Sequence, residues 1–135
     1  MKQLTLFALL FGFSLSAVGQ IVKESTKVDF IKSIYFSRAD QLQQIPLIRR
    51  NESFTLYFDD LLAQDNDYYY RIKHFNHDWT PSDLIQNQYL EGFDNQRIEN
   101  FNSSYGTLQT YNNYALTLPT NDTRFRISGN YMIEI

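Results

Sequence analysis

The sequence of 135 residues contains no cysteine, and it has only 5 glycines, 3 prolines and 2 methionines. The absence of cysteine excludes disulfides, thiol catalysis and thiolate metal sites. The scarcity of glycine and proline argues against low-complexity sequence and long disordered segments. A single core typically takes ~100–150 residues, so the chain forms at most one domain, which side-chain packing alone must hold together.

The sequence also lacks a cluster of basic residues. Its 12 Lys and Arg are scattered among 15 Asp and Glu, which gives a formal net charge of −3. A protein that binds nucleic acid needs a basic surface to neutralise phosphates. Nucleic acid is therefore not an expected partner.

Aromatic residues are abundant, with 11 Phe and 10 Tyr in so short a chain, and such rings pack well on pleated sheets. From residue 21 onward, short runs of alternating apolar and polar residues are separated by polar turns, without a long helical period or a repeat. We therefore predict an all-β fold for residues 20–135, an antiparallel β-sandwich like those of immunoglobulin and fibronectin type III domains.

Residues 1–19 have the pattern of a secretory signal peptide. Lys2 supplies positive charge, residues 4–13 are apolar, and residues 17–19 place small side chains before a cleavage site at Gln20. A membrane anchor is the alternative, but the apolar run is shorter than the ~20 residues that cross a bilayer. No cysteine follows for lipid attachment, and no later segment is apolar enough to span a membrane. We expect export to the periplasm and a mature chain without a membrane span.

Alternation predicts strands over residues 31–38, 42–48, 53–58, 68–74, 89–93 and 114–118, and in a last run over 123–135 that turns at 128–130. Pro46 cannot donate to a ladder, so the second of these strands is expected at a sheet edge. Residues 95–107 are polar and weakly periodic, and no structure is assigned to them.

The same alternation assigns side chains to faces. Those expected in the core are Phe54, Leu56, Phe58, Tyr68, Tyr70 and Ile72, and those expected in solvent are Tyr69, Arg71 and Lys73. Phe75 falls on the solvent side, which predicts a bulge or the end of pairing near His74. After Trp79, a cap at Thr80, Pro81 in the first helical position and the acid Asp83 predict one short helical turn.

Two segments compete for a tyrosine corner, in which a buried hydroxyl bonds to the backbone and pins a loop. One has Leu108 and Tyr114 in the spacing of fibronectin type III domains. The other has Gly129 and Tyr131, like the turn before the penultimate strand of immunoglobulin-like domains, and we favour it because the run after Tyr131 is more apolar. The last strand of the sandwich is then missing, and we expect the sequence to be a truncated piece of a longer protein.

No pattern indicates catalysis. The chain has no G-x-S-x-G motif, and no pair of carboxylates is singled out for glycoside hydrolysis. His74 and His77, with Asp78 beside them, could bind zinc on a helix, but in a strand they point to opposite faces and lack a third ligand. We expect a protein that is not an enzyme and has no cofactor.

A short acidic segment supplies oxygen donors of the kind that bind calcium. It lacks the glycine turn and the distal glutamate of an EF-hand, so we expect acids in solvated turns and leave calcium open. The residues are Asp59, Asp60, Asp65 and Asp67.

Four aromatic residues fall on faces or loops that the pattern leaves in solvent: Tyr57, Tyr69, Tyr89 and Phe93. Exposed aromatics are typical anchors for protein or sugar partners. A sandwich with aromatic side chains on its outer face also occurs without any partner, and the sequence favours neither interpretation.

Taken together, the motifs resemble those of the N-terminal domain of type IX secretion system plug proteins of Bacteroidota. The motifs are FDDL at 58–61, DYYYRIKHFNHDWTPSDL at 67–84, YLEGF at 89–93, TLQTYNNYALTLP at 107–119 and RISGNYMIEI at 126–135. They include the residues that we take as a structural signature, namely Tyr68, Tyr70, Trp79, Pro81, Leu108, Tyr114, Gly129 and Tyr131. The resemblance implies a periplasmic protein that associates with the outer-membrane translocon barrel and closes its periplasmic opening. Family members continue past the position of Ile135, and no binding residue is carried over from them.

Two other functions stay open. The triple-tyrosine strand and the Asp78-Trp79 step also resemble the periplasmic sandwich module of two-component sensors, although such modules sit inside long chains. A carbohydrate-binding accessory module is the third hypothesis, and it requires clustered exposed aromatics.

Overall fold

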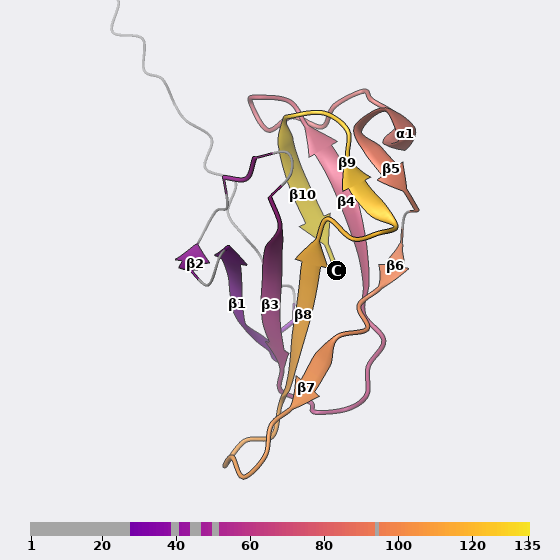
Figure 1. The fold of residues 1–135 in the computed structure, drawn as a ribbon. Coiled ribbons are helices and arrows are strands. Elements are labelled where there is room, and N and C mark those ends of the chain that lie inside the picture. Colours follow the sequence, from indigo (N-terminus) through magenta and orange to yellow (C-terminus); the bar gives the residue numbers. More distant parts are fainter. Residues whose placement is uncertain (1–27, 39–40, 44–46, 50–51, 94) are drawn as a thin grey trace, which may run out of the picture.

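The computed structural model describes residues 28–38, 41–43, 47–49, 52–93 and 95–135. This part of the chain folds as an antiparallel β-sandwich with one short helix, which confirms the all-β fold class (Figure 1). The expected signal peptide, residues 1–19, lies outside the described residues. No helix in the described ranges is long and apolar enough to cross a bilayer.

One layer of the sandwich is a five-stranded sheet with the order β2-β1-β3-β8-β7. Its strands are β1 (Ile31–Arg38), β2 (Gln41–Gln43), β3 (Phe54–Asp60), β7 (Phe101–Ser103) and β8 (Asn112–Leu118). β3 and β8 pair along their whole length, from Phe54 opposite Leu118 to Asp60 opposite Asn112. This pair forms the centre of the sheet.

The other strands form two smaller sheets. Three strands pair in the order β10-β4-β6, with β4 at Tyr69–Phe75, β6 at Gln96–Arg97 and β10 at Asn130–Glu134. β5 (Leu90–Gly92) pairs with β9 (Thr123–Phe125), next to the helix α1 (Gln86–Tyr89). α1 lies at the end of the molecule opposite the β7–β8 loop (Figure 1).

The core lies between the sheets and is built from alternate residues of β3, β4 and β8. Its buried members include Phe54, Leu56, Phe58, Tyr70, Ile72, Tyr114, Leu116 and Leu118. The expected alternation in β3 is therefore confirmed, and it continues two residues further to Asp60, which is fully buried. Tyr68 is half-buried against this core, while Tyr69, Arg71 and Lys73 are exposed, as expected.

Of the two alternatives expected near His74, the end of pairing is confirmed, because β4 ends at Phe75, and the bulge is absent. β4 pairs with β10 in unbroken register as far as His74 opposite Tyr131 and Phe75 opposite Asn130. His74 stays on the inner side, where its ring packs against Tyr89 and Tyr131, so the alternation has no reason to break. Phe75 lies on the other side, with its ring centroid 6.1 Å from that of Trp79.

The short helical turn expected after Trp79 is absent, and a tight return turn takes its place. The Asn76 N–H donates to the Thr80 carbonyl at 2.8 Å, and Pro81 forms a bridge with Phe75. Asp78 Oδ1 accepts from both the N–H and the hydroxyl of Thr80, so these donors serve the turn rather than a helix. The helix α1 begins later, where the Gln88 side chain accepts from the Ile85 N–H.

Two edge strands differ from the expected bounds. β2 is described over Gln41–Gln43, at the sheet edge where a strand was expected; residues 47–49 are not in a strand, and Pro46 lies outside the described residues. The strand predicted at residues 89–93 is β5, but Tyr89 belongs to α1, which reverses the side to which it points. Residues 95–107, left without structure, contain β6 and β7.

Candidate functional site

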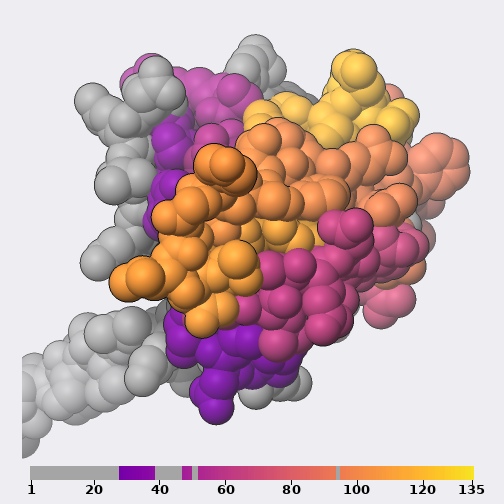
Figure 2. Space-filling view, turned by 90° about the horizontal axis from the view of Figure 1, so that it is seen from below, coloured from indigo at the N-terminus to yellow at the C-terminus, as the bar shows by residue number. Residues whose placement is uncertain are grey.

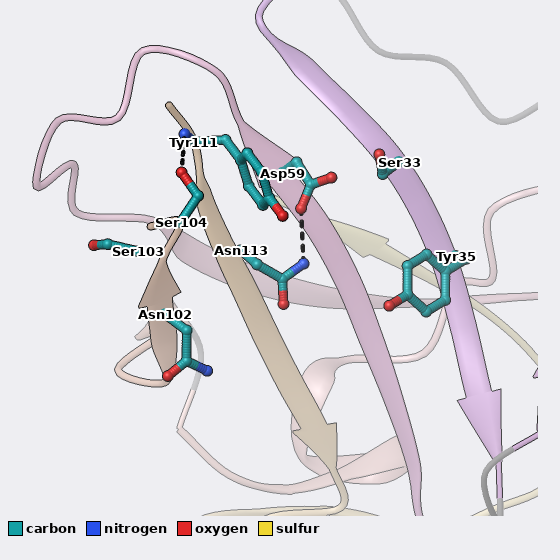
Figure 3. A pocket seen from close by; sticks show the side chains of 8 residues that line it. All are labelled: Ser33, Tyr35, Asp59, Asn102, Ser103, Ser104, Tyr111 and Asn113. Carbon is teal, nitrogen blue, oxygen red and sulfur yellow. Dashed lines mark hydrogen bonds between the residues drawn. The ribbon is translucent and has the colours of Figure 1, made fainter. Parts of the chain in front are cut away.

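The outer face of the five-stranded sheet carries an open groove of about 460 Å³ (Figure 3). β1 and β3 form one side of it, and β7, β8 and the start of their loop form the other. The lining residues are Ser33, Tyr35, Asp59, Asn102, Ser103, Ser104, Tyr111 and Asn113. All of these side chains can form hydrogen bonds, and two carry rings.

Strand alternation explains why polar side chains line the groove. Asp59 lies between the inward-facing Phe58 and Asp60, and Asn113 lies between the buried Asn112 and Tyr114. Both side chains therefore point outward from adjacent strands, and the Asn113 amide donates to Asp59 Oδ1 at 2.8 Å. This bond fixes the floor of the groove.

The β1 side of the groove contains a β-bulge. The register between β1 and β3 shifts between Lys32 and Tyr35, and Ser33 lies in the left-handed region with φ of 53°. A residue other than glycine adopts this conformation at a cost, and such residues are frequent in bulges at binding sites. The bulge presents Ser33 and Tyr35 at the wall of the groove.

The ring of Tyr35 stacks on that of Tyr57, with centroids 5.0 Å apart. Burial raises the pKa of Tyr35, and the neighbouring Tyr57 and Asp59 raise it further, so its hydroxyl stays neutral at physiological pH. The eight lining residues include no histidine, lysine or arginine. The groove can accept a polar ligand by hydrogen bonding, and the one carboxylate in its lining, that of Asp59, is already held by the Asn113 amide.

Beyond the groove, the loop between β7 and β8 projects as a hairpin (residues 104–111), which we call the β7–β8 hairpin (Figure 1). At its base the backbone N–H groups of Ser104 and Tyr111 donate to the Tyr111 carbonyl and the Ser104 hydroxyl, each at 2.8 Å. At its tip the side chains of Tyr105 and Leu108 are 100% and 112% exposed. The sequence analysis did not identify Tyr105 as an exposed residue. The absence of charged residues between Glu99 and Asp122 was the signal in the sequence that could have drawn attention to this segment.

The acidic segment is not uniformly a set of solvated turns, and for Asp60 that expectation is wrong. Its carboxyl is fully buried and accepts from the Leu62 N–H, the Asn66 amide and the Tyr68 hydroxyl, at 2.8–2.9 Å. Asp65 and Asp67 are exposed, and Asp67 pairs with Arg97 at 2.6 Å. Among the described residues no three His, Asp or Glu side chains gather as a metal site would require.

His74 and His77 do not converge. His77 is exposed in the turn, whereas His74 packs its ring 5.6 Å from that of Tyr89 and 5.1 Å from that of Tyr131. His74 Nδ1 lies 2.9 Å from the Ser82 hydroxyl, and its Nε2 is buried with no hydrogen-bond partner among the described residues. Gly129 lies directly against this nitrogen.

The favoured tyrosine corner is present. The Tyr131 hydroxyl donates to the Ile127 carbonyl at 2.8 Å, four residues earlier in the chain. The competing segment is not a corner: Leu108 is fully exposed, and the buried Tyr114 donates to the carbonyl of Asn66 in the β3–β4 loop.

The remaining signature residues, and the four aromatic residues expected in solvent, differ in how far they are buried. Tyr70 is buried, Trp79 is partly buried and Pro81 is exposed in the turn. Of the aromatics expected in solvent, Tyr69 and Phe93 are exposed and Tyr57 is half-buried in its stack with Tyr35. The expectation for Tyr89 is wrong, because α1 turns it inward and it is only 8% exposed. None of the four lines the groove, and neither of the two interpretations of these aromatics is favoured by it.

Comparison with known proteins identifies the family. The sequence profile of the first domain of type 9 secretion system plug proteins matches residues 31–135. The chain belongs to this family. The resemblance seen in the motifs is thereby confirmed, and the plug-family domain is a component of protein secretion rather than a member of a known enzyme family.

A solved structure supports the fold of the plug-family domain. The crystal structure of a hypothetical protein from Parabacteroides merdae ATCC 43184 is 37% identical in sequence and superimposes with a TM-score of 0.74. The similarity covers 78% of this chain and 27% of that protein, so the chain spans about a quarter of that protein's length. No curated protein matches the chain.

Proposed function

We propose that the chain is a non-enzymatic periplasmic part of the type IX secretion system, which associates with the outer-membrane translocon barrel and closes its periplasmic opening. The observation that carries this proposal is the family match over residues 31–135. The signal pattern of residues 1–19 supports the periplasmic location. A groove lined by hydrogen-bonding side chains, on a sheet without clustered metal ligands in the described residues, agrees with a role in binding.

Deletion of residues 20–135 from the full-length protein tests the proposal. If the domain closes the barrel, cells carrying the deletion should take up a dye that the intact outer membrane excludes, and restoring the wild-type gene should abolish uptake. The full-length wild-type protein should also copurify with the barrel. Unchanged uptake together with undiminished copurification of the deleted form would contradict the proposal.

A second function, carbohydrate binding, is favoured by the groove. Amide, hydroxyl and carboxylate groups surround it and Tyr35 and Tyr111 supply rings, a combination that suits sugar hydroxyls and ring faces (Figure 3). Calorimetry with soluble bacterial polysaccharides tests this function, and heat that disappears in Asn113→Ala would support it. No observation in the described residues favours the sensor module.

A further inference from the structure

The most exposed large apolar side chains of the described residues belong to one short loop. Tyr105 and Leu108 lie three residues apart at the tip of the β7–β8 hairpin, and solvent reaches each of them fully. Figure 2 views the molecule from this end and shows the hairpin as orange atoms on the face turned towards the viewer. Single exposed apolar residues are ordinary, but two on one projecting tip form an anchor of the kind found in interfaces.

The hairpin is held in place without help from these two side chains. The Thr107 hydroxyl donates to the Gln109 carbonyl at 2.7 Å, and the Gln109 amide donates to the Leu61 carbonyl of the β3–β4 loop at 3.1 Å. The bonds between Ser104 and Tyr111 close its base. A loop that is already ordered loses little conformational entropy on binding, so its exposed side chains can contribute more to affinity.

The charge of the hairpin restricts the kind of partner. From Asn100 to Asn121 the chain has no Asp, Glu, Lys, Arg or His, although 20% of all residues are charged. A loop that adsorbs to a membrane usually carries Lys or Arg for the anionic headgroups, and this one has none. An uncharged tip with one tyrosine and one leucine suits an uncharged apolar pocket on a protein.

We propose that Tyr105 and Leu108 are the anchor residues with which the domain docks into an apolar pocket of a protein partner. On the basis of the proposed function, we take that partner to be the translocon barrel. The polar groove begins at the base of the same hairpin, because Ser104 and Tyr111 belong to both (Figure 3).

The test uses the full-length protein with both anchors replaced, Tyr105→Ser with Leu108→Ser. Copurification with the barrel should fall about tenfold or more, as expected when interface anchors are truncated. The matched control replaces Leu47 and Ile85 by serine, since these side chains are 84% and 64% exposed and lie outside the hairpin. The control should bind like wild type, and both variants should unfold at the wild-type temperature because none of the four residues is buried.

The outcomes separate this inference from the proposed function. Failure of the wild-type protein to copurify overturns both. Wild-type copurification with equal binding by the anchor variant overturns the docking inference alone, as does loss of binding in the Leu47 and Ile85 control only. A photo-crosslinker at position 105 should join the protein to the barrel. Wild-type binding to phosphatidylethanolamine–phosphatidylglycerol vesicles that the anchor variant loses would replace the protein partner by a membrane.

Discussion

At the scale of single residues, Asp60 organises one end of the sandwich. Its buried carboxyl receives three donors from the β3–β4 loop, and side chains of β8 hold the same loop, with the Asn112 amide donating to the Gln64 carbonyl and the Tyr114 hydroxyl to that of Asn66. The loop is thus fixed by polar groups that the alternation of β3 and β8 places inside the fold.

We expect Asp60→Ala to lower the free energy of unfolding by about 3 kcal/mol or more, because it leaves three donors without their acceptor. Urea unfolding followed by fluorescence measures this loss. Asp67→Asn is the matched control, since Asp67 makes an exposed ion pair with Arg97 that is worth less than about 1 kcal/mol. Equal effects of the two substitutions would show that the Asp60 bonds do not stabilise the loop.

Gly129 meets the ring of His74. A Cβ at this position would lie 2.2 Å from His74 Nε2, and the rings of Tyr89 and Tyr131 leave the imidazole little room to move. We expect Gly129→Ala to destabilise by about 1–3 kcal/mol, in thermal or urea unfolding, through overpacking and through its φ of 158°, which side chains rarely adopt. In a His74→Ala background the same substitution should cost less, because only the backbone strain remains. An equal cost in both backgrounds would exclude the clash as its cause.

At the scale of elements, the turn between β9 and β10 depends on the Tyr131 hydroxyl. We expect Tyr131→Phe to lower the free energy of unfolding by about 1 kcal/mol, because it removes the hydroxyl with its bond to the Ile127 carbonyl at 2.8 Å and its longer one to the Tyr89 carbonyl at 3.4 Å. Tyr131→Ala should lower it by about 3–5 kcal/mol, because it also removes the ring. Urea unfolding of both variants separates the two contributions. Tyr69→Phe, on an exposed side chain, should change little, and a larger loss there than in Tyr131→Phe would argue against the corner.

At the scale of the whole molecule, partly buried tyrosines make the free energy of unfolding depend on pH in the alkaline range. Burial raises the pKa of Tyr68 and of Tyr131 from 10.0 to about 12, and the hydrogen bond and negative charge of Asp60 add to the effect at Tyr68. A pKa that is higher in the folded state means that folding favours the neutral phenol. This contribution is complete below pH 10 and is lost as the pH rises through about 12.

The free energy of unfolding, measured in urea at successive pH values, should therefore fall between pH 10 and about 12. The double variant Tyr68→Phe, Tyr131→Phe should show a weaker fall, because two of the groups that cause it are gone. Burial also raises the pKa of Tyr114, so part of the slope should remain. An identical slope in the double variant would contradict this assignment.

Much of the fold follows from period-two patterns. β3, β4 and β8 are long enough to alternate clearly, and the core residues of β3 and β4 were predicted from that alone. The inward position of Asp60 continues the series Phe54, Leu56, Phe58, but its charge led to a solvated assignment. The pattern of one strand does not show that three hydrogen-bond donors from the β3–β4 loop surround the Asp60 carboxyl inside the fold.

The short elements and the groove could not be predicted in this way. β6 and β7 have two and three residues, too few to alternate, and they exist because β4 and β8 offer them pairing partners. Tyr89 was misassigned because α1 reverses its direction. The groove combines residues from four strands, and the exposure of Leu108 depends on how far the hairpin projects, so both are properties of the assembled sheet.

The full pairing of β3 with β8 has a kinetic consequence. Residues 61–111 separate the two strands, so the central ladder forms only after a long loop has closed. Folds dominated by such distant pairings fold slowly, and until β8 arrives the apolar side chains of Phe54, Leu56 and Phe58 lie on an incomplete sheet. Until β8 has paired and Leu118 is buried, the partly folded chain can therefore aggregate or bind a chaperone.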